Sequence, residues 1–450
     1  MAAGTYRARS VKGMRDLLPP ETEVWARVES TARAVFARYG FAEIRTPIVE
    51  ETELFVRGVG EATDIVGKEM YTFADKNGKS LTLRPENTAP VARAFAEHGL
   101  REWPQPVRLF YVGPQFRYER PQRGRYRQFH QIGAELIGDA GPWSDAEIIL
   151  LLMSFLGELG FRDLKALVNT VGDVESRATY RERLRAHLLP RAAELGEDSR
   201  RRLETNPLRI LDTKSPDEIA LLASAPRLEE CLSEASALHF RDVLATLESC
   251  GVAVEVSDRL VRGLDYYTHT VFEIVSPGQS VSGITPHPGQ ALPGLGAQNA
   301  IVGGGRYDQL IEELGGPPTP AIGFAIGLDR LIEILPAATR ERRASEPVFY
   351  AVAVGEVAPL EVLRLAEEMR AQGWTVMPEL QSSSMRTALR RADKLGVDYV
   401  ALLGADELAR GEVTIKDFRS GDQTALPRGT KLGGELERWR REAAARPTAP

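Results

Sequence analysis

Hydrophobic residues recur with a helical period in several parts of the chain. Between residues 21 and 40 apolar side chains return every three or four positions, and Gly40 then provides a common helix stop. Residues 143–160 are apolar on nearly all sides, which is typical of a buried helix. From about 173 to 250 Arg, Glu, Leu and Ala dominate and glycine is scarce. This composition predicts an inserted helical module.

Two extended runs on either side of an arginine-rich loop predict a β-hairpin. Residues 106–119 and 127–138 each have about the length of a strand, a pattern typical of an antiparallel pair. On the second run Gln131, Gly133 and Glu135 share one face, because side chains alternate along a strand. The missing side chain at Gly133 predicts a gap through which a ligand would approach the backbone.

Changes in composition along the chain predict its domains. We expect a first domain over residues 1–335 and a polar, Pro-flanked linker over 336–346. Strand and helix patterns alternate over 347–430, which predicts a small α/β domain. Residues 431–450 are expected to form a partly disordered tail.

The charge balance argues against indiscriminate binding to nucleic acid. The 450 residues include 57 basic and 63 acidic side chains, giving a net charge of −6. Residues 117–128 nevertheless contain five arginines, which are Arg117, Arg120, Arg123, Arg125 and Arg127. An anionic partner is therefore expected to meet a local patch.

Cysteine content and hydropathy indicate a cytoplasmic protein with no membrane segment. Only Cys231 and Cys250 occur, too few for a secreted chain of this size held together by disulfides. The N-terminal residues lack the apolar core of a signal peptide. No apolar run approaches the ~20 residues needed to cross a bilayer.

Familiar nucleotide and metal motifs are incomplete. GKS at 78–80 resembles the end of a P-loop, but Phe73 stands where that loop requires glycine. GGGRY at 303–307 is followed by Asp308 where a dinucleotide fingerprint needs its third glycine. No spaced set of metal-binding Cys or His residues occurs, so any chemistry on ATP requires another kind of site.

The polar residues leave two interpretations open at two places. The face at 131–135 is either solvated or, beside an arginine-rich loop, a site for a phosphate-bearing ligand. Arg262 either forms a structural ion pair with Asp258 or Asp265, or points at phosphate in a cleft. For His130 we favour a packed or backbone-bonded side chain.

In this order the segments resemble the histidine–tRNA ligases (histidyl-tRNA synthetases) of the class II aminoacyl-tRNA synthetase family. The resemblance runs from VKGMRDLLP at 11–19 to TIKDF at 414–418. TLRPENTA and FRYERPQRGRYRQFHQ carry the class II signature, and RGLDYYTHTVFE with GGGRYD is typical of the histidyl branch. The family implies an α+β catalytic domain, in which helices flank an antiparallel sheet, with a helical insertion. It also implies a C-terminal α/β anticodon-binding domain and a homodimer formed through residues 44–55.

Site roles follow from the resemblance, residue by residue. Histidine would be bound by Glu86, Asn87, Thr88, Gln131, Glu135, Tyr266, Tyr267 and Tyr307. Arg117 and Arg262 would be catalytic and would bind the ATP phosphates, with Gln131 and Arg330 also at the nucleotide. The acceptor end of the tRNA would meet Arg120, Gln122 and Arg123. Arg306 would line the same pocket as Tyr307.

The implied reaction joins L-histidine to ATP, giving histidyl-adenylate and pyrophosphate, and then transfers histidine to histidine tRNA. Mg²⁺ would bridge the phosphates without a dedicated protein cage. The main alternative is the regulatory subunit of ATP phosphoribosyltransferase, a non-catalytic paralogue, and another is a degenerate synthetase-like module that binds tRNA. Paralogues of the first kind typically lack the C-terminal domain and the arginine of RGLDYY, both of which this chain retains.

Departures from the family pattern are few. Asn87 stands where many relatives have Gly, His269 where Lys or Arg is usual, and Gln309 where Gly or Asn is frequent. The Gly- and Pro-rich stretch 277–298 is expected to be a mobile surface loop.

Overall fold

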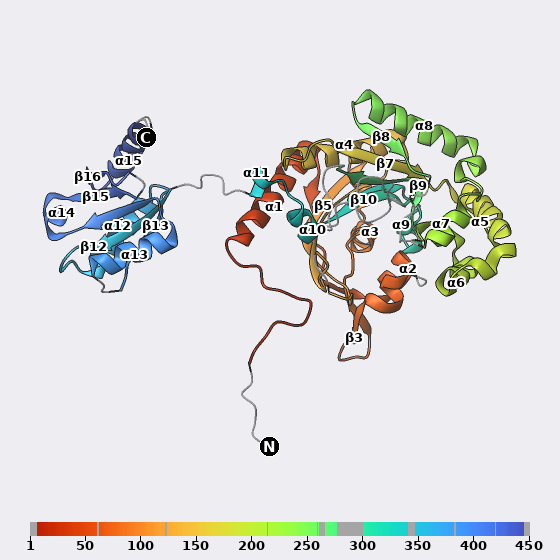
Figure 1. Ribbon diagram of the computed structural model, residues 1–450, viewed down its shortest axis with the longest axis horizontal. Helices are drawn as coiled ribbons and strands as arrows, with labels where there is room; N and C mark the ends of the chain where they lie inside the picture. The colour runs from red at the N-terminus through yellow and green to blue at the C-terminus, as the bar shows by residue number, and fades with distance from the viewer. Residues whose placement is uncertain are drawn as a thin grey trace, which may run out of the picture. The chain divides into compact units, whose positions relative to one another are not determined.

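The protein forms two compact units, Met1–Arg340 and Glu341–Pro450 (Figure 1). The computed structural model describes residues 7–60, 63–121, 124–213, 215–258, 260, 266–276, 300–340, 347–381, 384–418 and 420–444. The loop expected at 277–298 lies outside these residues.

An eight-stranded sheet organises the first unit, in the order β1-β5-β6-β11-β10-β9-β7-β8. Its strands are β1 (Ala42–Glu43), β5 (Val107–Phe116), β6 (Gln128–Ile137), β7 (Lys165–Thr170), β8 (Ala253–Val256), β9 (Thr268–Val275), β10 (Ala300–Arg306) and β11 (Ala321–Gly327). Every pair from β5 to β7 is antiparallel, whereas the edge strands β1 and β8 join in parallel. The predicted hairpin is β5–β6, and it lies next to the central strand β11. A smaller sheet, in the order β2-β4-β3, consists of β2 (Val49–Glu51), β3 (Tyr71–Ala74) and β4 (Ser80–Leu83).

Helices bury both faces of the large sheet. On one face α1 (Glu21–Arg38), α4 (Pro142–Glu158) and α8 (Glu234–Ser249) contribute to a single apolar core (Figure 1). Phe36 lies at its centre and meets the rings of Phe110, Phe155 and Phe324 edge-on, at centroid distances of 5.4, 5.5 and 5.9 Å. On the opposite face α3 (Thr88–Glu97) and α9 (Leu310–Glu313) pack with the strands around a group of buried tyrosines.

Shorter helices complete the first unit. They are α2 (Thr52–Val59), α10 (Leu328–Glu333), α11 (Ala337–Arg340), the π-helix Ile65–Glu69 and the 3₁₀ turn Leu100–Glu102. Thr339 in α11 donates from its hydroxyl to the carbonyl of Leu159, and the Thr339 carbonyl accepts from Arg27. The predicted linker therefore begins too early, because residues 337–340 are helical and bonded to the first unit.

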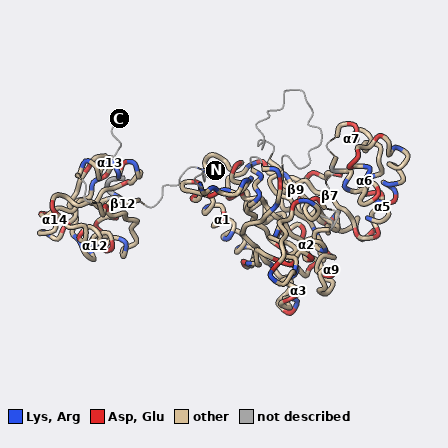
Figure 2. Tube along the Cα trace, turned by 90° about the horizontal axis from the view of Figure 1, so that it is seen from below, with Lys and Arg blue, Asp and Glu red and all other residues tan. Residues whose placement is uncertain are grey.

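The chain between β7 and β8 forms a helical module. Its helices are α5 (Val174–Leu188), α6 (Glu197–Thr205), α7 (Pro216–Leu222) and α8, with 3₁₀ turns at Leu189–Glu194, Pro207–Asp212 and Leu228–Cys231. Basic and acidic residues are interspersed over α5, α6 and α7 (Figure 2). Their apolar side chains, including Tyr180, Leu184 and Leu203, form a separate small core.

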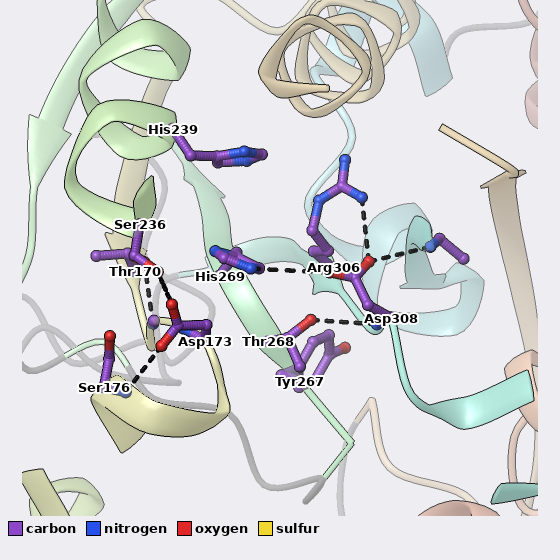
Figure 3. Close-up of polar contacts among 12 residues, drawn as sticks. Thr170, Asp173, Ser176, Ser236, His239, Tyr267, Thr268, His269, Arg306 and Asp308 are labelled. Carbon is purple, nitrogen blue, oxygen red and sulfur yellow. Dashed lines mark hydrogen bonds and ion pairs between the residues drawn. The ribbon is translucent and has the colours of Figure 1, made fainter. Parts of the chain in front are cut away.

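One carboxylate joins the start of α5 to the start of α8. Asp173 caps α5 by accepting from the Ser176 amide at 2.8 Å, and it also accepts from the hydroxyls of Ser233 and Ser236 at 2.5 and 2.9 Å (Figure 3 shows Asp173 between Ser176 and Ser236). These hydrogen bonds outweigh the burial and hold the pKa of Asp173 well below its usual range.

The second unit is a five-stranded sheet with helices. The strand order is β13-β12-β14-β15-β16. The strands are β12 (Val348–Ala353), β13 (Thr375–Pro378), β14 (Tyr399–Leu403), β15 (Glu412–Asp417) and β16 (Gln423–Pro427), and the helices are α12 (Pro359–Arg370), α13 (Met385–Leu395), α14 (Ala405–Arg410) and α15 (Leu432–Ala444). Strands β13, β12 and β14 are parallel, and β15 and β16 extend the sheet in antiparallel fashion.

The prediction of a tail from residue 431 is wrong for residues 432–444. Leu432, Leu436 and Trp439 follow the i, i+4, i+7 spacing of one helix face, and all three are buried in the core that also contains Phe349. The high content of charged residues in this segment belongs to the exposed side of α15. Residues 445–450 lie outside the described part of the chain.

We predict that Leu436→Ala destabilises the second unit by about 2–5 kcal/mol, because it leaves a cavity under α15 where the native side chain is fully buried. Arg438→Ala, on the exposed side of the same helix, is the matched control. Chemical denaturation followed by the fluorescence of Trp374 and Trp439 measures both variants. Equal effects would contradict the packing of α15.

Candidate active site

One face of the β5–β6 hairpin carries the polar residues expected at a site. In the ladder Gly113 pairs with Gln131, Tyr111 with Gly133, and Leu109 with Glu135. The gap expected over Gly133 is filled, since a Cβ there would lie 2.3 Å from the Cζ and hydroxyl oxygen of Tyr111. The notch therefore receives a protein side chain and not a ligand. Sequence reasoning missed Tyr111 because cross-strand register decides which side chain occupies the space.

Glu135 forms the floor of the site and is fully buried. The Thr88 hydroxyl donates to one carboxylate oxygen at 2.9 Å, and the Tyr307 hydroxyl donates to the other at 2.6 Å. These three residues come from β6, from the first turn of α3 and from the end of β10. Gly323 on the neighbouring strand leaves the room for the carboxylate, because a Cβ there would lie 1.7 Å from Glu135 Oε2.

Burial raises the pKa of Glu135 to about 8, and the nearby charge of Glu86 adds to the rise. The hydrogen bonds from Tyr307 and Thr88 oppose it without cancelling it. Near neutral pH the ligand-free carboxyl is therefore largely protonated. A group that donates a hydrogen bond or carries positive charge would restore the carboxylate.

A second carboxylate, Glu86, lies at the N-terminus of α3. It accepts from the backbone amides of Thr88 and Ala89 at 2.7 and 3.0 Å, which satisfies two of the helix's free N–H groups. Burial raises its pKa, while these hydrogen bonds and the charge of Arg117 act in the opposite direction. Each oxygen keeps a lone pair for another donor. Neighbouring Asn87 is also buried, and its side-chain oxygen accepts from the Thr46 hydroxyl at 2.7 Å.

Arg117 approaches the same carboxylate from the arginine-rich loop. Its Nε donates to the Pro85 carbonyl at 2.8 Å, and its guanidinium carbon lies 5.3 Å from the centroid of the Phe129 ring. The structure thus brings Arg117, Glu86 and Glu135 together. Arg262 lies outside the described residues, although Leu260 and Tyr266 on either side of its segment belong to the cluster that contains Tyr111 and Tyr307.

Three tyrosine rings cluster beside Glu135. Tyr266 lies 4.8 Å from Tyr267 and 5.7 Å from Tyr307 between ring centroids, and all three are buried. Gly305 permits the approach of Tyr267, whose Cδ1 would lie 2.7 Å from a Cβ at that position. The aromatic residues predicted at the site are therefore close together.

The open part of the site lies over Gln131. Its ladder partners are Gly113 on β5 and Gly327 on β11, and neither has a side chain. The Arg84 guanidinium occupies the space over Gly113, where a Cβ would lie 2.6 Å from Arg84 Nη2, so the opening is on the Gly327 side. A Cβ at Gly327 would meet no atom within 4 Å. The side-chain oxygen of Gln131 is buried and has no hydrogen-bond partner within the described part of the chain. This oxygen is thus free for a donor on a ligand.

Further positive charge lies at the end of α10 and on the loop. Arg330 follows Gly327 by about one helical turn, and both burial and the charge of Arg125 lower its pKa. An anion near Arg330 and Arg125 would relieve their mutual repulsion. Arg120 is exposed. Gln122 and Arg123 lie outside the described residues.

The expectation that Arg306 lines the pocket is wrong. Adjacent residues on a strand point to opposite faces, and Tyr307 is the one that faces Glu135. Arg306 is fully buried and donates from Nε to Asp145 at 3.0 Å and from Nη1 to Asp308 at 3.1 Å. Figure 3 shows its guanidinium beside Asp308, away from Tyr267.

Two histidines border this buried ion pair. His239 on α8 lies 2.8 Å from Asp145, and its ring is tilted against that of His269 at a centroid distance of 5.1 Å (Figure 3). His269 has a φ of +45° in an irregular stretch of the β9–β10 ladder. Its pKa is lowered by burial and by the charges of His239 and Arg306, while Asp308 acts oppositely. Its Nε2 lies 3.9 Å from Asp308, so His269 contacts protein groups at the position where the family resemblance led us to expect Lys or Arg.

The His130 side chain is packed, which is one of the two states that we favoured. Its ring meets Trp25 edge-on at 5.0 Å, and its backbone N–H donates to Asp329 at 2.9 Å. No group of three or more His, Cys, Asp or Glu side chains in the described residues is arranged to hold a metal ion. In the same residues we find no helix with the length and apolar character needed to cross a membrane.

Comparison with known proteins decides the family. Residues 13–331 match the model of the family described as histidyl-tRNA synthetase. The chain belongs to the histidyl-tRNA synthetase family. Residues 350–432 match a second model, described as anticodon binding domain.

Individual relatives of the family agree over nearly the whole chain. A histidine–tRNA ligase of Geobacillus thermodenitrificans is 47% identical over 433 residues, covering 96% of this chain and 98% of its own. One from Thermosynechococcus vestitus is also 47% identical, over 95% and 96% of the two chains. The crystal structure of apo S. aureus histidyl-tRNA synthetase superposes with a TM-score of 0.77 at 33% identity, covering 96% and 100%.

These relatives confirm the expected enzyme class, an aminoacyl-tRNA ligase, and its class II fold with a C-terminal anticodon-binding domain. The regulatory paralogue has less support than the ligase, since curated histidine–tRNA ligases match at high coverage.

We predict that Glu135→Gln stabilises the ligand-free protein increasingly as pH rises from 5 to 8. The folded-state pKa of Glu135 is about 8, against 4.5 ordinarily, so the native state holds a proton that the unfolded chain releases in this window. Wild-type stability therefore falls through the window, whereas Gln cannot ionise. The difference in free energy of unfolding between Glu135→Gln and wild type should therefore grow by about 3 kcal/mol from pH 5 to pH 8.

Thermal unfolding at pH 5, 6, 7 and 8 measures this difference. Glu102→Gln, at an exposed position, is the control and should leave the pH profile unchanged. A pH-independent difference between Glu135→Gln and wild type would show that Glu135 is ionised in the native protein throughout.

Proposed function

We propose that the pocket around Glu135 is where this aminoacyl-tRNA ligase activates L-histidine with ATP and then loads histidine onto histidine tRNA. The observation that carries the proposal is the buried Glu135 carboxyl, held by two hydroxyls inside a wall of tyrosines. A buried carboxyl in such a setting selects a ligand with a complementary hydrogen-bond donor.

Histidine recognition follows from the two nitrogens of the imidazole ring. One N–H would donate to Glu135, and Tyr267, with Tyr266 packed beside it, would meet the other nitrogen. Thr88 and Tyr307 fix the orientation of the Glu135 carboxyl before the ligand arrives. An amino acid without both nitrogens would leave buried polar groups unpaired, at a cost of several kcal/mol.

The rest of the amino acid would lie toward α3 and Gln131. The α-ammonium would donate to the remaining lone pairs of Glu86, with Asn87 and Thr88 beside it and the Gln131 oxygen as a further acceptor. A cation at this place would also stabilise the charged form of Glu86, whose burial otherwise disfavours ionisation. The carboxylate of histidine would then point away from Glu86, toward the arginines.

ATP would bind with its α-phosphate between Arg117 and Arg262 and its adenine beside Arg330. An oxygen of the histidine carboxylate attacks the α-phosphorus, the bond to the pyrophosphate oxygen breaks, and pyrophosphate leaves with the electron pair. The two guanidinium groups would stabilise charge on the phosphoryl oxygens, which is a task of positioning and electrostatics. Mg²⁺ would be bound largely by the triphosphate, since the described residues form no metal cage.

The tRNA would meet both units. Arg120, Gln122 and Arg123 would contact the acceptor end, so binding should weaken as salt rises. The second unit would bind the anticodon.

We infer a homodimer, which is supported by exposed apolar side chains on and beside the small sheet. Ile48, Val49 and Phe73 are 43%, 38% and 46% exposed there. We place the protein in the cytoplasm, in keeping with two free cysteines.

Pyrophosphate–ATP exchange across the amino acids tests the proposal. Wild-type protein is expected to catalyse exchange with histidine alone. Arg262→Ala should bind histidine but lose exchange by about a thousandfold, an effect on the scale of lost transition-state stabilisation. Glu135→Gln should raise the KM for histidine more than that for ATP. Histidine binding without exchange in the wild type would favour the regulatory paralogue, and Arg262→Ala within threefold of wild type would refute the role of that arginine.

Deleting residues 346–450 separates adenylation from tRNA recognition. The first unit has its own cores, so exchange should persist, whereas tRNA charging should fall by about tenfold or more with the loss of a linked binding module. Charging measured at two tRNA concentrations checks whether the loss lies in KM. Full charging by the shortened chain would contradict the assignment of the second unit.

A further inference from the structure

The segment before α1 contacts the arginine-rich loop, although more than a hundred residues separate them in sequence. We define the strap as residues 12–15, which precede α1, and the loop as residues 117–127, between β5 and β6. The two are bonded through backbone and side-chain atoms. In Figure 1 the chain before α1 runs as an extended red trace.

The first contact is between Gly13 and Arg127. The Arg127 amide donates to the Gly13 carbonyl at 2.7 Å, and Arg127 Nη1 donates to the Lys12 carbonyl at 3.4 Å. Gly13 has a φ of +86°, and a Cβ there would lie 2.9 Å from both the Arg127 stem and Pro121. Both backbone conformation and space therefore require glycine at this position.

The second contact is made by Arg15. Its guanidinium carbon lies 4.7 Å from the centroid of the Tyr126 ring, and it forms ion pairs with Glu21 at 2.8 Å and Asp329 at 3.4 Å. Asp329 also accepts from the His130 amide at 2.9 Å. Arg15 thus links the part of the loop that leads into β6 to α1, to α10 and, through Asp329, to β6 itself.

Arg127 joins the strap to the other end of the loop, which directly follows β5. Its carbonyl accepts from the Arg117 amide at 2.9 Å, and its Nε donates to the Glu119 carbonyl at 3.2 Å. Its guanidinium carbon lies 3.8 Å from the centroid of the Tyr118 ring. This arginine therefore braces the base of the loop, in contrast to the exposed Arg120 nearer the tip.

We propose that Gly13 and Arg15 are positioning residues, which hold the base of the arginine-rich loop so that it presents the exposed Arg120 to the tRNA acceptor end. The proposal rests on the proposed tRNA role of that loop. A loop fixed at its base loses less conformational freedom when a ligand arrives, which lowers the cost of binding. Neither strap residue needs to touch the substrate.

Kinetics of Arg15→Gln test the proposal against a matched control. We expect KM for tRNA to rise by about tenfold, with kcat for histidine-dependent pyrophosphate exchange within about threefold of wild type. Arg15→Lys keeps the charge facing Glu21 and Asp329 and should give an intermediate KM. Arg9→Gln, exposed in the same segment, should behave as wild type. An unchanged tRNA KM in Arg15→Gln, or an equal loss in Arg9→Gln, overturns the proposal.

Hydrogen exchange supplies a readout that needs no substrate. In ligand-free Arg15→Gln and in Gly13→Ala, peptides covering residues 117–130 should exchange faster than in wild type, because the amide of Arg127 loses its fixed acceptor. Peptides from α4 should be unchanged, which excludes general unfolding. Unaltered hydrogen exchange at residues 117–130 in both variants would overturn the proposal that the strap holds the loop. If the variants exchange faster but the wild type shows no ligase activity, the role of the strap in holding the loop stands and the proposed function is rejected.

Discussion

The buried carboxyl of Glu135 is the group on which the site depends. It lies inside a protein interior where an ionised carboxylate is costly, and two hydroxyls from distant segments compensate for part of that cost. Thr88 can donate only if α3 begins where it does, and Tyr307 only if β10 ends where it does. The capping of α3 by Glu86 and the buried pairing of Arg306 with Asp145 each fix one of those two ends.

Two consecutive residues at the end of β10 have different tasks, because one faces the site and the other stabilises the fold. Tyr307 faces the pocket while Arg306, one residue earlier, is anchored among Asp145, Asp308 and backbone carbonyls on the other side of the sheet. Removing one partner of such a buried pair would leave an uncompensated charge, typically 3–5 kcal/mol less stable. The ion pair is thus part of what holds a neutral tyrosine hydroxyl 2.6 Å from Glu135.

Much of this arrangement could be predicted from local patterns. The alternation at 127–138 identified the hairpin and the common face of Gln131 and Glu135, and helical spacing identified α1, α4 and the inserted module. The roles of distant residues came from the family resemblance, which carries information on long-range proximity that periodicity lacks. Gly133 shows the limit, because cross-strand register placed Tyr111 in a gap that the sequence had suggested for a ligand. The opposite directions of Arg306 and Tyr307, and the helix at 432–444, likewise depended on which neighbours were present to pack against.

Gly323 has a consequence for how the pocket can change its preference among amino acids. Its α-carbon lies so close to the Glu135 carboxylate that not even a methyl group fits between them. A shorter residue at 135 would open a void against β11, but a side chain at 323 would still lie 2.6 Å from the backbone carbonyl oxygen of Ala134. Glycine at 323 is therefore required by the neighbouring strand as well as by the carboxylate, and an altered preference among amino acids would have to come from position 135 and the residues that donate to it, not from a matching change at 323.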